Sequence, residues 1–237
     1  MFELRSKRVL VIAPHPDDEV FGCGGLIYRL KEHGSAVHVL FLTVGTTADF
    51  SARGRSTAAE RLAEVERVSG ALRFDSHHVA FPGDEYHLRL DALPRRDLVH
   101  AIERGCALSL ERLKPDIVLA PSSSDYNQDH QAAYEATMTA LRPGAPEHKA
   151  FPPVVLTYEL PYQAWSVNDT QPAPNLLVPL DADALRAKLG ALELYRSQLK
   201  SLNGPVSLRG AERLARYRGL LCGAEAAEAF HVKRVVV

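Results

Sequence analysis

The sequence predicts an α/β protein with a doubly wound, mostly parallel sheet and helices on both of its faces. Two patterns in the 237 residues lead to this prediction. Short, nearly continuous apolar runs alternate with segments whose apolar residues recur at helical spacing. Apolar runs without polar alternation are typical of strands buried on both faces, as in parallel sheets. Since crossovers between parallel strands are right-handed, this alternation predicts a doubly wound sheet.

The individual elements are expected in the following order. We expect strands at residues 9–13, 36–43, 78–81, 116–120 and 154–159. We expect helices at residues 24–33, from a cap at Ser56 to near Gly70, and at residues 95–113, 129–141, 181–200 and 207–221. The helix after Ser56 should bury Leu62, Val65 and Val68. We expect residues 45–55 to form a loop that can move over a site, residues 161–179 to be an irregular Pro-rich stretch and residues 230–237 an apolar tail.

Composition restricts the classes of function. The net charge of −1 and the absence of a basic run argue against a nucleic-acid partner. No apolar run approaches the roughly 18 residues of a membrane span, so none is expected. Three cysteines, Cys23, Cys106 and Cys222, lie far apart without a CxxC pair. This spacing indicates neither a disulfide framework nor a thiolate zinc site, and it favours a reducing cytoplasm.

A charged cluster follows the first expected strand. Residues 14–19 read PHPDDE, which sets one histidine and three carboxylates at the end of a buried strand. Ligands of open α/β sheets bind in the crevice at the carboxyl ends of the strands. Burying adjacent like charges is costly unless a cation lies among them. His15 and Asp18, three positions apart on one side of a turn, therefore suggest a divalent metal, with Asp17 directed elsewhere.

A second polar loop leaves the same edge of the sheet. The strand at 116–120 ends in PSSSDYNQD, residues 121–129, and His130 then opens a helix. Alone, His130 is best explained as a histidine capping that helix. The pairing of the two loops instead favours a ligand that completes a His-Asp-His set. Three N/O ligands with an open fourth position are typical of catalytic zinc.

Other motifs that carry chemistry do not fit. The glycines of GCGG, residues 22–25, lack GxGxxG spacing, and carboxylates stand where a pyrophosphate would have to lie. The sequence also contains no Walker A motif, GxSxG elbow or HExxH pair.

These residues resemble the PIG-L/LmbE family of N-acetylglucosaminyl deacetylases. The family's opening motif, AHPDDE, corresponds to APHPDDE at residues 13–19, with an inserted proline. Its second motif, His-x-Asp-His, matches residues 127–130 at the last two positions. Weaker similarity continues at residues 81–84, 157–161, 191–198 and 227–230, so that it spans nearly the whole chain.

The resemblance implies a zinc-dependent hydrolase that removes the N-acetyl group from an N-acetylglucosamine-type amino sugar or conjugate. His15, Asp18 and His130 would hold Zn²⁺, with Fe²⁺ or another divalent metal possible in its place. Asp17 would be the general base for the metal-activated water. The expected partner is a small acetylated amino sugar, and related proteins are often homo-oligomers.

One position departs from the family pattern. Asn127 stands where the family often has a histidine, and an amide cannot transfer a proton at neutral pH. We therefore expect Asp17 to serve as base and acid, with Asn127 at most polarising the substrate carbonyl. For Asp129 two interpretations stay open, which are orientation of a neighbouring ligand and capping of the helix.

Two alternative functions follow from the same residues. One is a metal-dependent hydrolase of another amide or of an ester. The other is a non-catalytic sugar-binding module, which the missing histidine at position 127 suggests and the presence of Asp17 opposes.

We expect one domain, residues 1–237, because no internal repeat or low-complexity linker divides the chain. Residues 1–145 would form a Rossmann-like core, and residues 150–237 would add strands and helices that complete the substrate side.

Overall fold

The computed structural model describes residues 4–49, 53–145, 147–163, 173–200 and 203–236. The strands are β1 (Arg8–Ala13), β2 (Ala36–Val44), β3 (Thr47–Ala48), β4 (Arg55–Ser56), β5 (Ser76–Pro82), β6 (Ile117–Pro121), β7 (Val154–Tyr158), β8 (Leu176–Leu180) and β9 (Ala226–Val235). The α-helices are α1 (Asp18–Glu32), α2 (Ala58–Leu72), α3 (Arg95–His100), α4 (Leu110–Leu113), α5 (Gln128–Ala140), α6 (Ala182–Leu194) and α7 (Leu208–Leu220).

Seven of the described strands form one sheet in the order β5-β2-β1-β6-β7-β9-β8. Strands β5, β2, β1, β6 and β7 pair in parallel, and β9 and β8 add an antiparallel edge. The chain winds from β1 outward through β2 to β5 and then returns to β6 on the other side of β1. The winding therefore reverses between β1 and β6, and the crevice at such a switch point is where ligands of this architecture bind.

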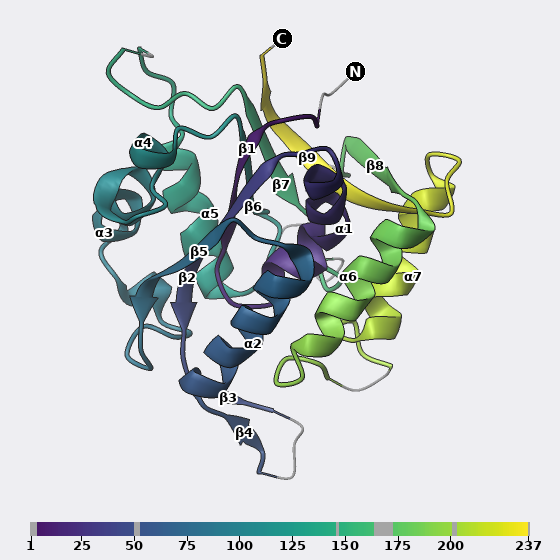
Figure 1. The fold of residues 1–237 in the computed structure, drawn as a ribbon. Coiled ribbons are helices and arrows are strands. Elements are labelled where there is room, and N and C mark those ends of the chain that lie inside the picture. The colour runs from purple at the N-terminus through teal and green to yellow at the C-terminus, as the bar shows by residue number, and fades with distance from the viewer. Residues whose placement is uncertain (1–3, 50–52, 146, 164–172, 201–202, 237) are drawn as a thin grey trace.

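Helices cover both faces of this sheet, as Figure 1 shows, with α1, α2, α6 and α7 on one side and α3, α4 and α5 on the other. Strand β1, buried from Val9 to Ala13, has side chains in both of these layers. Val9 and Val11 belong to the apolar cluster under α1, whereas Leu10 and Ile12 belong to the cluster under α3 and α5. The predicted fold class, a single α/β domain with a mostly parallel, doubly wound sheet, is confirmed.

The prediction of one continuous helix at residues 95–113 is wrong, because the helix is interrupted. After α3, a π-helical turn runs over Ala101–Gly105, and Cys106 is extended before α4 begins at Leu110. Gly105 lies so close to His100 that a Cβ atom would overlap its ring. The tight packing at this glycine and its low helix propensity account for the end of the helical run.

The predicted cap at Ser56 is also wrong by one residue. The Oγ1 atom of Thr57 accepts the N–H of Glu60, and the Glu60 carboxylate accepts the N–H of Thr57, which completes a capping box. Ser56 instead lies in β4 and donates to Asp49. Leu62, which we expected to be buried, is 39% exposed, and Arg61 lies on the buried side of α2 in its place.

The C-terminal elements differ from prediction mainly at their ends. Helix α6 ends at Leu194 and not at residue 200, and β9 begins at Ala226, before the predicted tail. Strand β8 overlaps the end of the predicted irregular stretch, of which residues 164–172 lie outside the described residues. The antiparallel pair β3–β4 overlaps the predicted loop at 45–55, of which residues 50–52 are likewise not described. Within the described ranges, no helix is long and apolar enough to cross a membrane.

The close contact between α1 and β7 leads to a prediction on stability. A Cβ atom on Gly22 would overlap the ring of Tyr158, whose hydroxyl is fixed by donation to the Ile12 carbonyl (2.9 Å). We expect Gly22→Ala to lower the free energy of unfolding by about 1–3 kcal/mol, as overpacking does in other cores.

A matched control lies at Gly190 in α6, where an added Cβ atom meets nothing within 4 Å. We expect Gly190→Ala to raise the free energy of unfolding by about 0.5–1 kcal/mol through helix propensity alone. Urea denaturation of both variants measures the two values. Equal effects at the two glycines would contradict the assigned contact.

Candidate metal centre

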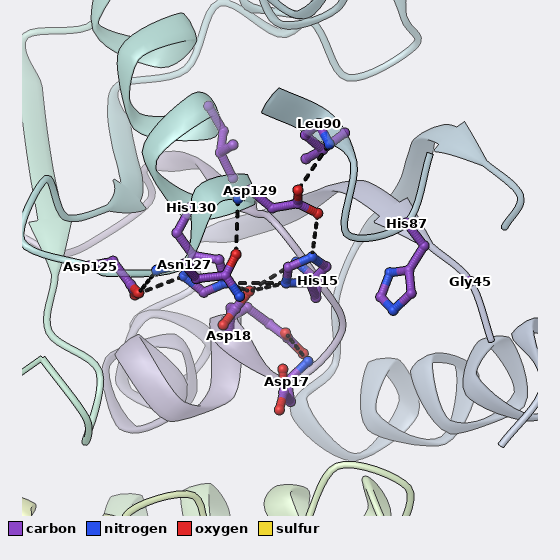
Figure 2. A network of polar contacts seen from close by, with 12 residues as sticks. His15, Asp17, Asp18, Gly45, His87, Leu90, Asp125, Asn127, Asp129 and His130 are labelled. Carbon is purple, nitrogen blue, oxygen red and sulfur yellow. Dashed lines mark hydrogen bonds and ion pairs between the residues drawn. The ribbon is translucent and has the colours of Figure 1, made fainter. Parts of the chain in front are cut away.

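The loops that follow β1 and β6 bring the motif residues together at the switch point. Strand β1 ends at Ala13 and α1 begins at Asp18, while β6 ends at Pro121 and α5 begins at Gln128. Because β1 and β6 are parallel neighbours, both loops leave the same edge of the sheet. Figure 2 shows His15, Asp18 and His130 converging there, with Asp17 beside Asp18.

Three side-chain atoms of this group form a triangle. His15 Nδ1 lies 3.1 Å from His130 Nε2 and 3.6 Å from Asp18 Oδ2, and the last two atoms are 3.3 Å apart. In a tetrahedral zinc site, bonds of about 2.0–2.2 Å set neighbouring ligand atoms about 3.3–3.6 Å apart. All three residues are buried. Two nitrogens and one carboxylate oxygen in this arrangement fit a divalent metal with a further coordination position left over.

Two further carboxylates determine which nitrogen of each ring faces this triangle. His15 Nε2 contacts Asp129 Oδ2, and His130 Nδ1 contacts Asp125 Oδ2, both at 2.9 Å. A carboxylate accepts the N–H of such a ring, so the other nitrogen keeps its lone pair for a metal. The carboxylates are themselves held, since Asp129 Oδ1 accepts the N–H of Leu90 and Asp125 Oδ1 that of Asn127, again at 2.9 Å.

The electrostatics of the centre favour a cation. Although burial opposes ionisation of Asp18, the neighbouring imidazoles of His130 and His15 lower its pKa. Burial likewise opposes a charged His130, yet the carboxylates of Asp18 and Asp125 raise its pKa to about 9. The ionised carboxylates around the two rings thus stabilise positive charge at the position that the three ligand atoms share.

Asp17 is buried next to the triangle without belonging to it. Burial and the nearby Asp18 carboxylate raise the pKa of Asp17, whereas Arg61 and His130 act in the opposite direction. Its backbone has the positive φ of 111°, which is uncommon for a residue with a side chain.

The two remaining predicted residues can now be located. Asn127 is the N-cap of α5, because its Oδ1 accepts the N–H of Asp129 at 2.9 Å. The capping alternative for Asp129 is therefore wrong, since its carboxylate contacts His15 and Leu90.

Sequence reasoning missed three buried residues around the centre, Asp125, Arg61 and His87. The Nη1 atom of Arg61 donates to the Gly45 carbonyl (2.9 Å) and to His87 Nε2 (3.0 Å), and the His87 ring stands edge-on to His15 with 5.2 Å between centroids. Burial and the Arg61 charge lower the pKa of His87 to about 3. Of these three residues, the sequence pattern indicates only Arg61, because its spacing from Val65 and Val68 places it on the apolar side of α2.

The chain is similar to known proteins over most of its length. A family model described as PIG-L, GlcNAc-PI de-N-acetylase, matches residues 10–141. The 2′-N-acetylparomamine deacetylase of Streptomyces fradiae is 30% identical over 93% of this chain and 85% of its own length.

Solved structures confirm the fold. An N,N′-diacetylchitobiose deacetylase from Pyrococcus horikoshii superposes with a TM-score of 0.70 at 22% identity, covering 98% of this chain and 87% of that one. A 4-carboxy-2-hydroxymuconate hydratase from Pseudomonas putida superposes with a TM-score of 0.72 at 21% identity, covering 98% of both chains. The same fold thus carries proteins named for different reactions, so the fold alone does not define the reaction.

Fold and site together define an α/β enzyme with a buried His-Asp-His group that fits a divalent metal. The family model covers more than half of the chain, and the Streptomyces relative aligns with nearly all of it. The chain belongs to the PIG-L (LmbE-like) family, and it is an enzyme of the deacetylase class.

The buried carboxylates lead to a prediction on metal affinity. We expect Asp125→Ala and Asp129→Ala each to weaken binding of a divalent metal by about 10–100-fold, because each removes the group that orients a histidine ligand. Competition with a chromogenic chelator measures the affinity. The control is Glu135→Ala in α5, which removes an exposed ion-pair partner of Arg95. It should leave the metal affinity unchanged. Affinities equal to that of the parent protein in all three variants would rule out the orienting role.

Proposed function

We propose that this enzyme is a zinc-dependent N-deacetylase that hydrolyses the acetamide of an amino sugar or amino-sugar conjugate. His15, Asp18 and His130 would hold the ion, and Fe²⁺ or another divalent metal is a possible substitute for Zn²⁺. The observation that carries the proposal is the triangle of ligand atoms, 3.1–3.6 Å apart and close to tetrahedral spacing, beside the buried carboxylate of Asp17.

The ion, when bound, would act as a Lewis acid and make a water molecule more acidic. Asp17 accepts the proton of the attacking water, whose oxygen forms a bond to the acyl carbon. The C–N bond then breaks, Asp17 returns the proton to the amine nitrogen, and acetate and a free amino sugar are released. A single residue that serves as base and acid suits this chain because Asn127 cannot transfer a proton.

The substrate class rests on the family and on the relatives. The Streptomyces relative is named for 2′-N-acetylparomamine, and the Pyrococcus structure for N,N′-diacetylchitobiose. We therefore propose a small acetylated amino sugar as the substrate.

We also propose that residues 150–237 complete the substrate side. The position of Tyr162 supports this, since its hydroxyl lies 3.5 Å from His130 Nδ1. A reducing compartment is supported by three free cysteines, and a homo-oligomer stays a proposal from family resemblance.

The reaction is tested by acetate release. With acetylated amino sugars we expect turnover that stops in a chelator and returns on addition of Zn²⁺. Asp17→Asn should lower kcat by about 10²–10⁴-fold, because it removes general acid–base catalysis while keeping the size of the side chain. A panel of other amides and esters covers the alternative hydrolase. Binding of amino sugars without any acetate release would favour the sugar-binding module, and near-parental turnover by Asp17→Asn would refute the role of Asp17.

A further prediction separates the two possible roles of Asn127. Asn127→Ser keeps a side-chain oxygen for the cap but removes the amide donor. If the amide polarises the substrate carbonyl, kcat should fall by about 10²–10³-fold. The thermal midpoint should stay close to that of the parent protein, because serine caps helices about as well as asparagine. An unchanged kcat would mean that Asn127 serves only as the N-cap of α5.

A further inference from the structure

The backbone of Asp17 is held in an unusual conformation at the centre. Its φ of 111° and ψ of −29° lie in the left-handed region, which side chains rarely occupy. Such a conformation persists only where the surroundings require it. Figure 2 shows this residue next to Asp18, at the point where the loop enters α1.

Both backbone groups of Asp17 are bonded. Its carbonyl accepts the N–H groups of Val20 (3.0 Å) and Phe21 (2.9 Å), which are bonds of the first turn of α1. Its N–H donates to Oε2 of Glu19 at 3.1 Å. A buried N–H without an acceptor is costly, so the Glu19 carboxylate stabilises the orientation that positive φ gives to this group.

The Glu19 carboxylate is itself held by a hydrogen bond from a residue in the C-terminal part of the chain. Its Oε1 accepts the hydroxyl of Tyr195 at 2.6 Å, across 176 positions of sequence. Tyr195 is the C-terminal cap of α6, where its N–H bonds to the Leu192 carbonyl, and α6 packs against α1. Glu19 and Tyr195 are both fully buried. The bridge from α6 to Asp17 therefore consists of two hydrogen bonds through one carboxylate.

We propose that Glu19 and Tyr195 are positioning residues for Asp17. Their bridge holds the Asp17 backbone at positive φ, and this sets the direction in which the Asp17 carboxylate leaves the chain. The inference rests on the proposed role of Asp17 as the base. Neither residue belongs to the His-Asp-His group, so the bridge acts on proton transfer and not on the number of ligands.

A pair of tyrosine variants separates positioning from general support of the core. Tyr195 and Tyr158 are both fully buried, and each hydroxyl donates one hydrogen bond, to Glu19 (2.6 Å) and to the Ile12 carbonyl (2.9 Å) respectively. Tyr195→Phe and Tyr158→Phe thus remove the same group at the same depth. Only the first substitution breaks the bridge to Asp17.

We expect Tyr195→Phe to lower kcat by about 10–100-fold, because small displacements of a catalytic group reduce rates by this order. KM should stay within about twofold of the parent value, and metal content should be unchanged. Tyr158→Phe should keep kcat within about twofold, although both variants lower the thermal midpoint. Glu19→Gln provides a second break in the same bridge if Tyr195→Phe does not fold, and it should reduce kcat at least as much.

The Asp17→Asn background gives the decisive readout. If the bridge acts through Asp17, adding Tyr195→Phe to Asp17→Asn should not lower the residual rate further, since the group being positioned no longer transfers protons. A full additional loss would overturn the proposal, as would equal kcat values for the two tyrosine variants. Should Asp17→Asn itself keep its turnover, the proposed role of Asp17 as the base would fail instead, and with it the premise of this inference, so the two failures are distinct.

Discussion

The concentration of buried negative charge at one edge of the sheet is the constraint on which the rest depends. Four aspartates lie within the region of His15 and His130, and each is nearly or fully inaccessible to solvent. Buried carboxylates are stable only when paired, hydrogen-bonded or bound to a cation. Here Asp125 and Asp129 are bonded to imidazole and backbone N–H groups, whereas Asp18 faces two ring nitrogens. A divalent ion at that position would compensate the charge that remains.

The topology of the sheet makes this concentration possible. The winding reverses between β1 and β6, so the segments that follow the two strands lead to helices on opposite faces of the sheet, α1 and α5 (Figure 1). Each segment contributes one histidine, and the segment after β6 supplies both orienting carboxylates, Asp125 for His130 and Asp129 for His15. The antiparallel strands β9 and β8 lie away from this switch point, beyond β7 in the sheet.

The sequence was sufficient for the parts of the molecule that local patterns encode. The apolar strand before PHPDDE and the polar loop before His130 predicted the sheet edge and three residues that meet there, because both signals lie within a few residues of the chain. The break after His100 and the edge strand β8 depend on packing between distant segments, which periodicity does not contain. The same limit applies to His87, whose place beside His15 is set by Gly45 and Arg61 from two other elements.

The substitution at position 127 illustrates how local structure and chemistry are linked in this centre. Asparagine is among the best N-caps, and its side chain here accepts the N–H of Asp129. That cap fixes the first turn of α5, which carries both Asp129 and His130 towards the metal centre. A histidine at this position would transfer protons but would cap the helix poorly. In the proposed mechanism, Asp17 would then be the single residue that transfers protons, so the accuracy with which Asp17 is held would become correspondingly more important.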